Sequence, residues 1–198
     1  MASNVSFTRD GQLLIVSGFQ SVTLVFDPHT GDQVGPPIGD SAAPAYRTSL
    51  GPGNTLATTD FSGTIRLVDL ATREQVGPPM VGRPVPVSTV DVLPGGRQLV
   101  AAFYGSSGEA QLFEVANGQP IGDPFPSLGP FSASSVSPDG KTLITGDGAQ
   151  MMRWDLDSER WRTTACAVAG RNLTAEEWAQ YLPDGEPHRR TCPELATR

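Results

Sequence analysis

The chain has 198 residues, a formal net charge of −7 and 18% charged residues, with 22 glycines and 18 prolines. This length sustains one hydrophobic core, and the glycine and proline content favours many short strands joined by turns over a helical protein. The acidic balance, with Lys141 as the only lysine and the arginines scattered, excludes the basic face that nucleic-acid binding requires.

The sequence contains no candidate membrane span and no candidate secretory signal. No stretch approaches the roughly 20 consecutive apolar residues that cross a bilayer. Residues 1–11 lack the basic start and the apolar run of a signal peptide. We therefore expect no membrane association and a cytoplasmic location.

Two short patterns recur along the chain with the same period. The first pattern, Gly-x-x-Leu, begins at Gly11, Gly53, Gly96 and Gly140, with spacings of 42, 43 and 44 residues. The second pattern is an apolar or aromatic residue followed by an acid, and its landmarks are Asp27, Asp69, Glu114 and the Trp154–Asp155 pair. Two landmarks that share a period in the low forties indicate the blades of a β-propeller.

The repeats predict four blades and a tail. The blades are expected at about residues 4–43, 44–86, 87–128 and 129–168, and the tail at residues 169–198. Each repeat alternates apolar and polar residues as short strands do. The Gly-Pro-Pro segments that begin at Gly35 and Gly77 are expected at the outer edge of their blades, since proline cannot donate to a strand ladder. In the fourth repeat, residues 161–168 replace this segment and are predicted as a strand.

The tail carries the signals of one short helix. Thr174 is the expected N-cap, and Glu177 completes a capping box with it. Pro183 is expected to end the helix. A hydrophobic staple is expected between Leu173 and Trp178. The predicted apolar side of the helix comprises Leu173, Trp178, Tyr181 and Leu182. So short a helix is marginal alone, and we expect it to dock on other residues.

Candidate catalytic and metal-binding groups are sparse. The recurring acids could form a ring around a site, but capping of local turns is the favoured interpretation. Cys166, His188 and Cys192 would make only an incomplete zinc site, without a Cys-x-x-Cys unit or a fourth ligand. No nucleophile and base are visible together. We expect no catalytic residue, no cofactor and no metal.

Two segments resemble WD40 repeats: residues 136–143 with the Trp154–Asp155 pair, and residues 60–69. The tail resembles the C-terminal end of large bacterial WD40-repeat signalling proteins. That second resemblance rests on Trp161, Ala165–Cys166, Gly170–Thr174, Glu177–Trp178, Tyr181–Pro183 and Thr191–Pro193. It favours Cys166 and Cys192 as a structural pair joined by a disulfide. Two unrelated reduced thiols are the alternative, because a cytoplasmic location opposes a stable disulfide.

The expected fold is all-β, with four WD40-like blades forming a partial or small propeller and a short C-terminal α-helical cap. The resemblance implies a non-catalytic scaffold or sensor module of a bacterial signalling protein, with protein partners that are not identified. The alternatives are a propeller enzyme of the hydrolase or lactonase type and a truncated remnant of a longer WD40 protein. Four blades would leave an apolar flank open. We expect this flank to be covered by upstream blades of a longer parent or by a second copy that closes a ring.

Overall fold

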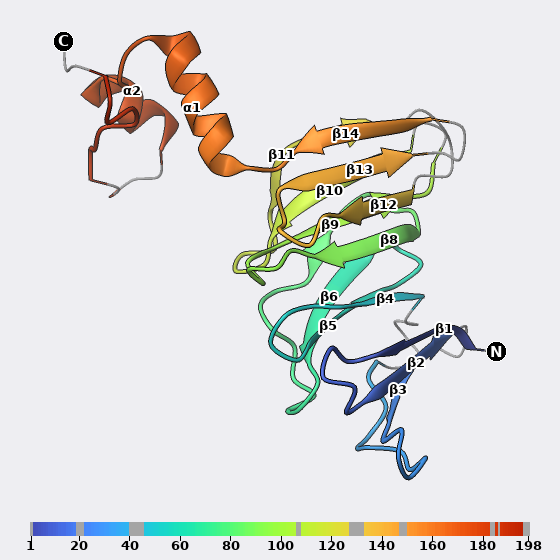
Figure 1. The fold of residues 1–198 in the computed structure, drawn as a ribbon. Helices are drawn as coiled ribbons and strands as arrows, with labels where there is room; N and C mark the ends of the chain where they lie inside the picture. The colour runs from blue at the N-terminus through green and yellow to red at the C-terminus, as the bar shows by residue number, and fades with distance from the viewer. Residues whose placement is uncertain are drawn as a thin grey trace. The chain divides into compact units, whose positions relative to one another are not determined.

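The computed structural model describes residues 2–18, 22–39, 46–105, 108–126, 133–146, 150–182, 185 and 187–195. The chain divides into two compact units, Met1–Asp155 and Leu156–Arg198. The described part of the first unit contains strands without helices, and the second unit contains two helices (Figure 1). Neither helix is long and apolar enough to cross a membrane.

The first unit consists of four antiparallel sheets that follow one another along the chain. The first sheet contains β1 (Ala2–Phe7), β2 (Leu14–Gly18) and β3 (Thr23–Phe26). The second contains β4 (Arg47–Leu50), β5 (Thr55–Thr59), β6 (Thr64–Asp69) and β7 (Met80–Val81). The third contains β8 (Val87–Val92), β9 (Gln98–Phe103), β10 (Glu109–Glu114) and β11 (Pro120–Pro126). The fourth contains β12 (Ala133–Val136), β13 (Thr142–Gly146) and β14 (Met151–Asp155).

The edges of the sheets differ from the expected four strands per repeat. In the first sheet the fourth strand is reduced to two isolated bridges, Phe26 to Gln33 and Thr23 to Ile38. Pro36 and Pro37 lie between these bridges and have no amide hydrogen with which to continue a ladder. In the second sheet the short β7 begins directly after such a proline pair. In the first two sheets the proline pairs therefore lie at the edge, where they limit strand length, whereas in the third sheet a proline-containing segment forms the full edge strand β11.

The strand predicted at residues 161–168 is wrong, because these residues belong to the helix α1 (Ser158–Ala169). Asp157 caps its start by accepting a hydrogen bond from the Glu159 backbone amide at 3.1 Å. Gly170 ends it in the left-handed conformation, with φ of 67°. The two caps outweigh the β-branched residues inside the segment. The sheet unit accordingly ends before α1 and not at the predicted residue 168.

The predicted tail helix is present as α2 (Ala175–Tyr181). The Thr174 hydroxyl accepts a hydrogen bond from the Glu177 amide at 3.2 Å, and the Glu177 carboxylate accepts one from the Thr174 amide at 2.9 Å. These two bonds form the predicted capping box. Pro183, which was expected to end the helix, lies outside the described residues.

Neighbouring sheets are sealed by apolar side chains. The landmark leucine of the second, third and fourth repeats is completely buried, at Leu56, Leu99 and Leu143. The seam between the first two sheets contains Ile15, Val25, Ile38, Leu56, Val68 and Leu70. A second cluster joins the second and third sheets through Ala57, Ile65, Leu67, Met80, Val87, Val90, Leu99, Ala101, Phe103, Phe113 and Val115. The first strands of the second, third and fourth sheets, β4, β8 and β12, lie side by side, and β2 of the first sheet contacts β4. This orders the sheets as blades are ordered in a propeller.

Small polar side chains join the first strands across these seams. The Asn4 side-chain amide donates to the carbonyl and the hydroxyl of Thr48, at 3.2 and 3.1 Å. The hydroxyls of Ser17 and Thr48 lie 3.0 Å apart. Between the third and fourth sheets the hydroxyls of Thr89 and Ser134 lie 2.6 Å apart. Hydrogen bonds near the first strand thus join the first sheet to the second and the third sheet to the fourth.

A buried carboxylate organises the turn between β5 and β6. Asp60 is 6% exposed. One carboxylate oxygen accepts from the Ser62 hydroxyl at 2.6 Å and from the Thr64 amide at 3.0 Å. The other accepts from the Arg66 guanidinium at 3.1 Å. Burial raises the pKa of the Asp60 carboxyl, but these hydrogen bonds outweigh it and hold the pKa below its usual range.

We expect Asp60→Ala to destabilise the sheet unit by roughly 2 to 3 kcal/mol at pH 7, since it removes charged hydrogen bonds and leaves buried donors unpaired. The lowered pKa means that the wild-type carboxylate stabilises the fold above about pH 4 and loses this effect as the pH falls. Urea unfolding at pH 7 and at pH 3 measures both effects. An equal difference between variant and wild type at the two pH values would contradict the assignment.

Candidate functional site

The recurring acids cap turns. Asp27 accepts hydrogen bonds from the backbone amides of His29 and Thr30, at 2.7 and 3.4 Å. Asp69 accepts the equivalent bonds from Ala71 and Thr72, at 2.8 and 2.9 Å. These bonds lower the pKa of both carboxyls. The turn-capping interpretation therefore holds in the first two repeats.

The later landmarks do not assemble a metal centre with the first two. Glu114 and Asp155 close β10 and β14 of separate sheets. Nowhere in the described ranges do three or more His, Cys, Asp or Glu residues gather as metal ligands. The Trp154 indole donates to the Thr145 hydroxyl at 2.9 Å, and its ring lies 5.4 Å from that of Phe125 in the third sheet. The aromatic landmark thus contributes to a seam between sheets.

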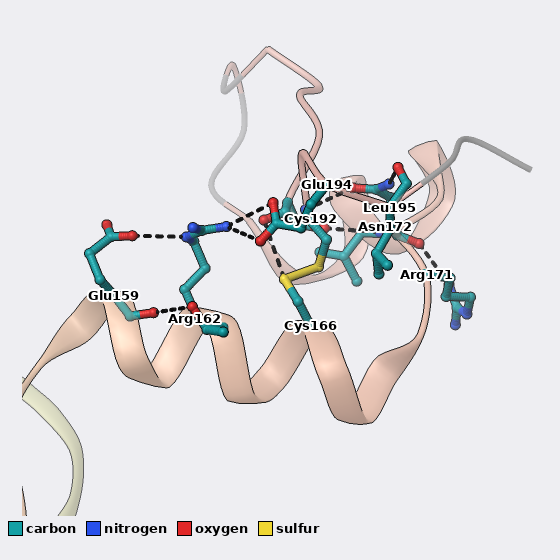
Figure 2. The surroundings of a disulfide bond; sticks show 11 residues. Glu159, Arg162, Cys166, Arg171, Asn172, Cys192, Glu194 and Leu195 are labelled. Carbon is teal, nitrogen blue, oxygen red and sulfur yellow. Dashed lines mark hydrogen bonds and ion pairs between the residues drawn. A yellow bond between two sulfur atoms is a disulfide. The ribbon is translucent and has the colours of Figure 1, made fainter.

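The tail unit is stapled by a disulfide between Cys166 of α1 and Cys192 (Figure 2), whose Cα atoms are 5.6 Å apart. The Cys192 amide donates to the Asn172 side chain at 2.7 Å. Arg162 forms ion pairs with Glu159 and Glu194, both at 3.2 Å. Because both thiols are used in the disulfide, they cannot serve as the zinc ligands that the sequence left open.

The predicted apolar side of α2 is only partly right. Trp178 is 5% exposed, and its ring meets the edge of His188 at 5.4 Å between centroids. Tyr181 is 68% exposed and does not belong to the buried side. Leu173 is half-buried, and its amide and carbonyl contact Thr191 and His188 at 3.2 Å each. His188 therefore has a structural role.

A cavity of about 690 Å³ lies where the turns after β1, β4, β8 and β12 converge. All four turns lie on the same side of the sheet unit (Figure 1). Apolar and proline side chains form much of the wall, including Phe7, Leu50, Val92 and Val136. The polar residues in the wall are Thr8, Arg9, Asp10, Asn54, Asp91 and Ser137. The cavity is thus assembled from four repeats, each of which contributes one turn.

Asp91 differs from the other acids in its surroundings. It is half-buried near the end of β8, and burial raises the pKa of its carboxyl to about 6, although a hydrogen bond from the Val136 backbone acts in the opposite direction. The equivalent positions, which pair with the residue after each landmark leucine, hold Ser6, Ser49 and Ser135. The first, second and fourth repeats thus place a neutral hydroxyl at this position, and the third repeat places a carboxyl there.

Asp10 lies in the same cavity wall, and its carboxylate forms its hydrogen bonds within its own turn. Its carboxylate accepts from the Thr8 hydroxyl at 2.6 Å and from the Gln12 amide at 3.1 Å. These bonds lower the pKa of Asp10. Sequence reasoning missed Asp91 because a single Asp in a strand carries no motif. Its signal is visible only when the four repeats are aligned, as an acid in a column of serines.

The structure resembles solved structures at low sequence identity. It matches the computationally designed Ika4 protein with a TM-score of 0.66 and 11% identity, over 78% of this chain and 91% of that chain. It matches a chain of the Mitotic Checkpoint Complex with a TM-score of 0.67 and 19% identity, over 79% of this chain and 48% of that chain. The chain therefore spans about half the length of the second protein.

No protein-family model matches the sequence, and no curated protein matches it. The structural likenesses and the four antiparallel sheets define the fold class. The protein is an all-β, propeller-like structure with two short C-terminal helices.

We expect Asp91→Asn to stabilise the sheet unit by about 2 kcal/mol at pH 7. The raised pKa means that ionisation of Asp91 weakens the fold as the pH rises from about 4 to about 6, and the amide removes this charge while its oxygen can still accept a hydrogen bond. Asp10→Asn is the matched control and should destabilise, because its lowered pKa reports bonds that favour the charged form. Thermal unfolding measures both, and equal signs would contradict the assignment.

Trp178→Ala should destabilise the tail unit by roughly 2 to 4 kcal/mol, as expected for the loss of a large buried aromatic side chain. Tyr181→Ala is the control and should change stability by less than about 0.5 kcal/mol, because Tyr181 is exposed. Helical circular dichroism during urea unfolding follows this unit. A comparable loss of stability in both variants would contradict the conclusion that burial of Trp178 stabilises the tail unit.

Proposed function

We propose that this protein is a non-catalytic interaction module, built of WD40-like blades, that binds a protein partner in the cavity formed by the four turns. The resemblance of the tail supports a place in a bacterial signalling protein. The cytoplasmic location expected from the sequence would require the Cys166–Cys192 disulfide to persist against reduction. The cavity supports the binding role, because its wall combines apolar contact surface with a few polar groups that can orient a ligand.

The observation that carries this proposal is the carboxyl of Asp91. A half-buried carboxyl with a raised pKa weakens the fold at neutral pH, and a serine serves the same position in the other repeats. A group that reduces stability at one position of a repeat marks a functional position. A partner that places a cation beside Asp91 stabilises the ionised carboxylate, which burial disfavours.

The partner chemistry follows from this site. The cation is the side chain of a lysine or an arginine, carried by an extended segment whose neighbouring residues contact Leu50, Val92 and Val136. The described cavity wall contains neither histidine nor cysteine, and its second carboxylate, Asp10, is occupied by Thr8 and Gln12. This inventory supports recognition over acid–base or nucleophilic chemistry.

A phage-displayed library of short linear peptides tests the proposal. Selection on the full chain at pH 7.5 should enrich peptides that contain Lys or Arg. Their affinity should fall about 10- to 100-fold with Asp91→Asn, the effect of one charge-assisted hydrogen bond. Affinity for the wild type should also fall as the pH drops below about 6, because Asp91 becomes protonated.

Ser49→Ala is the matched control, because it changes the equivalent position of the second repeat without changing charge. It should leave peptide affinity within about threefold of the wild type. Enriched peptides without a basic residue, or equal binding to the wild type and to Asp91→Asn, would overturn the role of Asp91. A stoichiometric metal content of the purified protein would count against a non-catalytic module.

A further inference from the structure

One face of the first sheet carries six apolar residues, and no sheet among the described residues covers it. It consists of two rows across the three strands, Val5–Val16–Leu24 and Phe7–Leu14–Phe26. We name these six residues the free face. Val5 and Phe7 are 56% and 59% exposed, and the other four are half-buried. The opposite face of the same sheet, with Ile15 and Val25, is sealed against the second sheet.

The equivalent positions in the other repeats are covered by the preceding sheet. Leu14 corresponds to Leu56, Leu99 and Leu143, which are all completely buried. Phe26 corresponds to Val68 and Phe113, which are 7% and 0% exposed. The free face is therefore a surface of the kind that this fold buries wherever a neighbour is present.

The free face is more apolar than the sealed faces. Val5 stands where the second and fourth sheets have Thr48 and Ser134, which make the hydrogen bonds across the seams. Leu24 stands where the second and third sheets have Arg66 and Gln111. The third sheet has Val90 at the first of these positions, and the fourth sheet has Met152 at the second. The free face is apolar at both positions, which none of the other three sheets is, and it therefore suits a partner surface that is entirely apolar.

The outer face of the fourth sheet does not match this requirement. Arg153 occupies the position at which the first three sheets place Val25, Leu67 and Leu112. Packing this face onto the free face of another copy would bury a guanidinium among six apolar side chains, which is unfavourable without a paired acid. Closure of a ring by two head-to-tail copies is therefore disfavoured.

We propose that the free face binds the same face of a second copy, with the two first sheets packed face to face about a twofold axis. The surface in the described chain that matches the free face in its lack of polar groups is the free face itself. In a twofold contact the same surface patch of both copies meets, so the patch must be complementary to itself. Val5, Phe7 and their neighbours become buried in the dimer, and Arg153 stays in solvent.

The size of the surface sets the strength of the contact. Three strands of 6, 5 and 4 residues form it. With strands about 4.8 Å apart, a face of this size buries on the order of 1,000 Å² in total over both copies, at the small end of specific interfaces. The dimer should therefore be in equilibrium with the monomer, with a dissociation constant in the micromolar range. Because the contact contains no charge, added salt should not weaken it.

Sedimentation velocity of the full chain, from about 1 to about 200 μM, tests the proposal. The wild type should shift from monomer to dimer across this range. Val5→Lys should remain monomeric throughout, since the twofold axis places an unpaired ammonium in the contact twice. Val5→Thr copies the residue of the second sheet and should raise the dissociation constant roughly tenfold. If circular dichroism shows that Val5→Lys does not fold, Val5→Thr tests the proposal instead.

Met151→Lys is the control, because Met151 is 81% exposed on the outer face of the fourth sheet. It should dimerise as the wild type does. A wild type that is monomeric up to the highest concentration would overturn the proposal and leave the free face to a different partner. A loss of the dimer in both Val5→Lys and Met151→Lys would overturn it in favour of head-to-tail closure. Val5 variants that dimerise as the wild type does would overturn it as well.

Discussion

The fold of the first unit depends on the burial of one apolar face of each sheet against the sheet before it. A sheet of three or four short strands has two faces and little interior of its own, and an isolated one gains little stability in water. The landmark leucine marks the row that must be covered, and Leu56, Leu99 and Leu143 show that the neighbour covers it completely. The sheets are therefore mutually dependent, as in other repeat proteins, where neighbour contacts supply most of the stability.

This dependence fixes where recognition is possible. The seams use the faces of the sheets, and the outer edges are limited by prolines, so the turns after the first strands are available for binding. Because β4, β8 and β12 lie side by side and Asn4 of β1 hydrogen-bonds to Thr48 of β4, the turns after the four first strands converge on one cavity. Asp91 stands at the end of such a strand, where a seam partly buries its carboxyl and the cavity leaves the carboxyl within reach of a ligand. The same packing thus raises the pKa and creates the site.

Much of the sheet unit could be predicted from the sequence, because glycines and acids at turns repeat with a fixed period. The role of Asp27 followed from local chemistry alone, since an Asp after a strand meets the amides two and three residues later. The helix α1 does not follow from residue propensity because its interior contains β-branched residues, whereas its ends are defined by the caps Asp157 and Gly170. Asp91 was missed for another reason. The backbone of Val136, which hydrogen-bonds to it from the fourth sheet, is distant in sequence.

The two units are stabilised by different means, and this makes them respond differently to redox conditions. The described tail unit buries few side chains, notably Cys166, Trp178 and Cys192. So small a unit needs a covalent staple, and a disulfide closing a loop of this length contributes about 3 kcal/mol. Reduction would leave the tail with the Cys192–Asn172 hydrogen bond and with exposed ion pairs that are individually weak. The sheets contain no cysteine, so reduction would not remove a covalent bond from them. The folded state of the tail therefore depends on the redox conditions of its compartment, whereas that of the sheets depends on packing and hydrogen bonds.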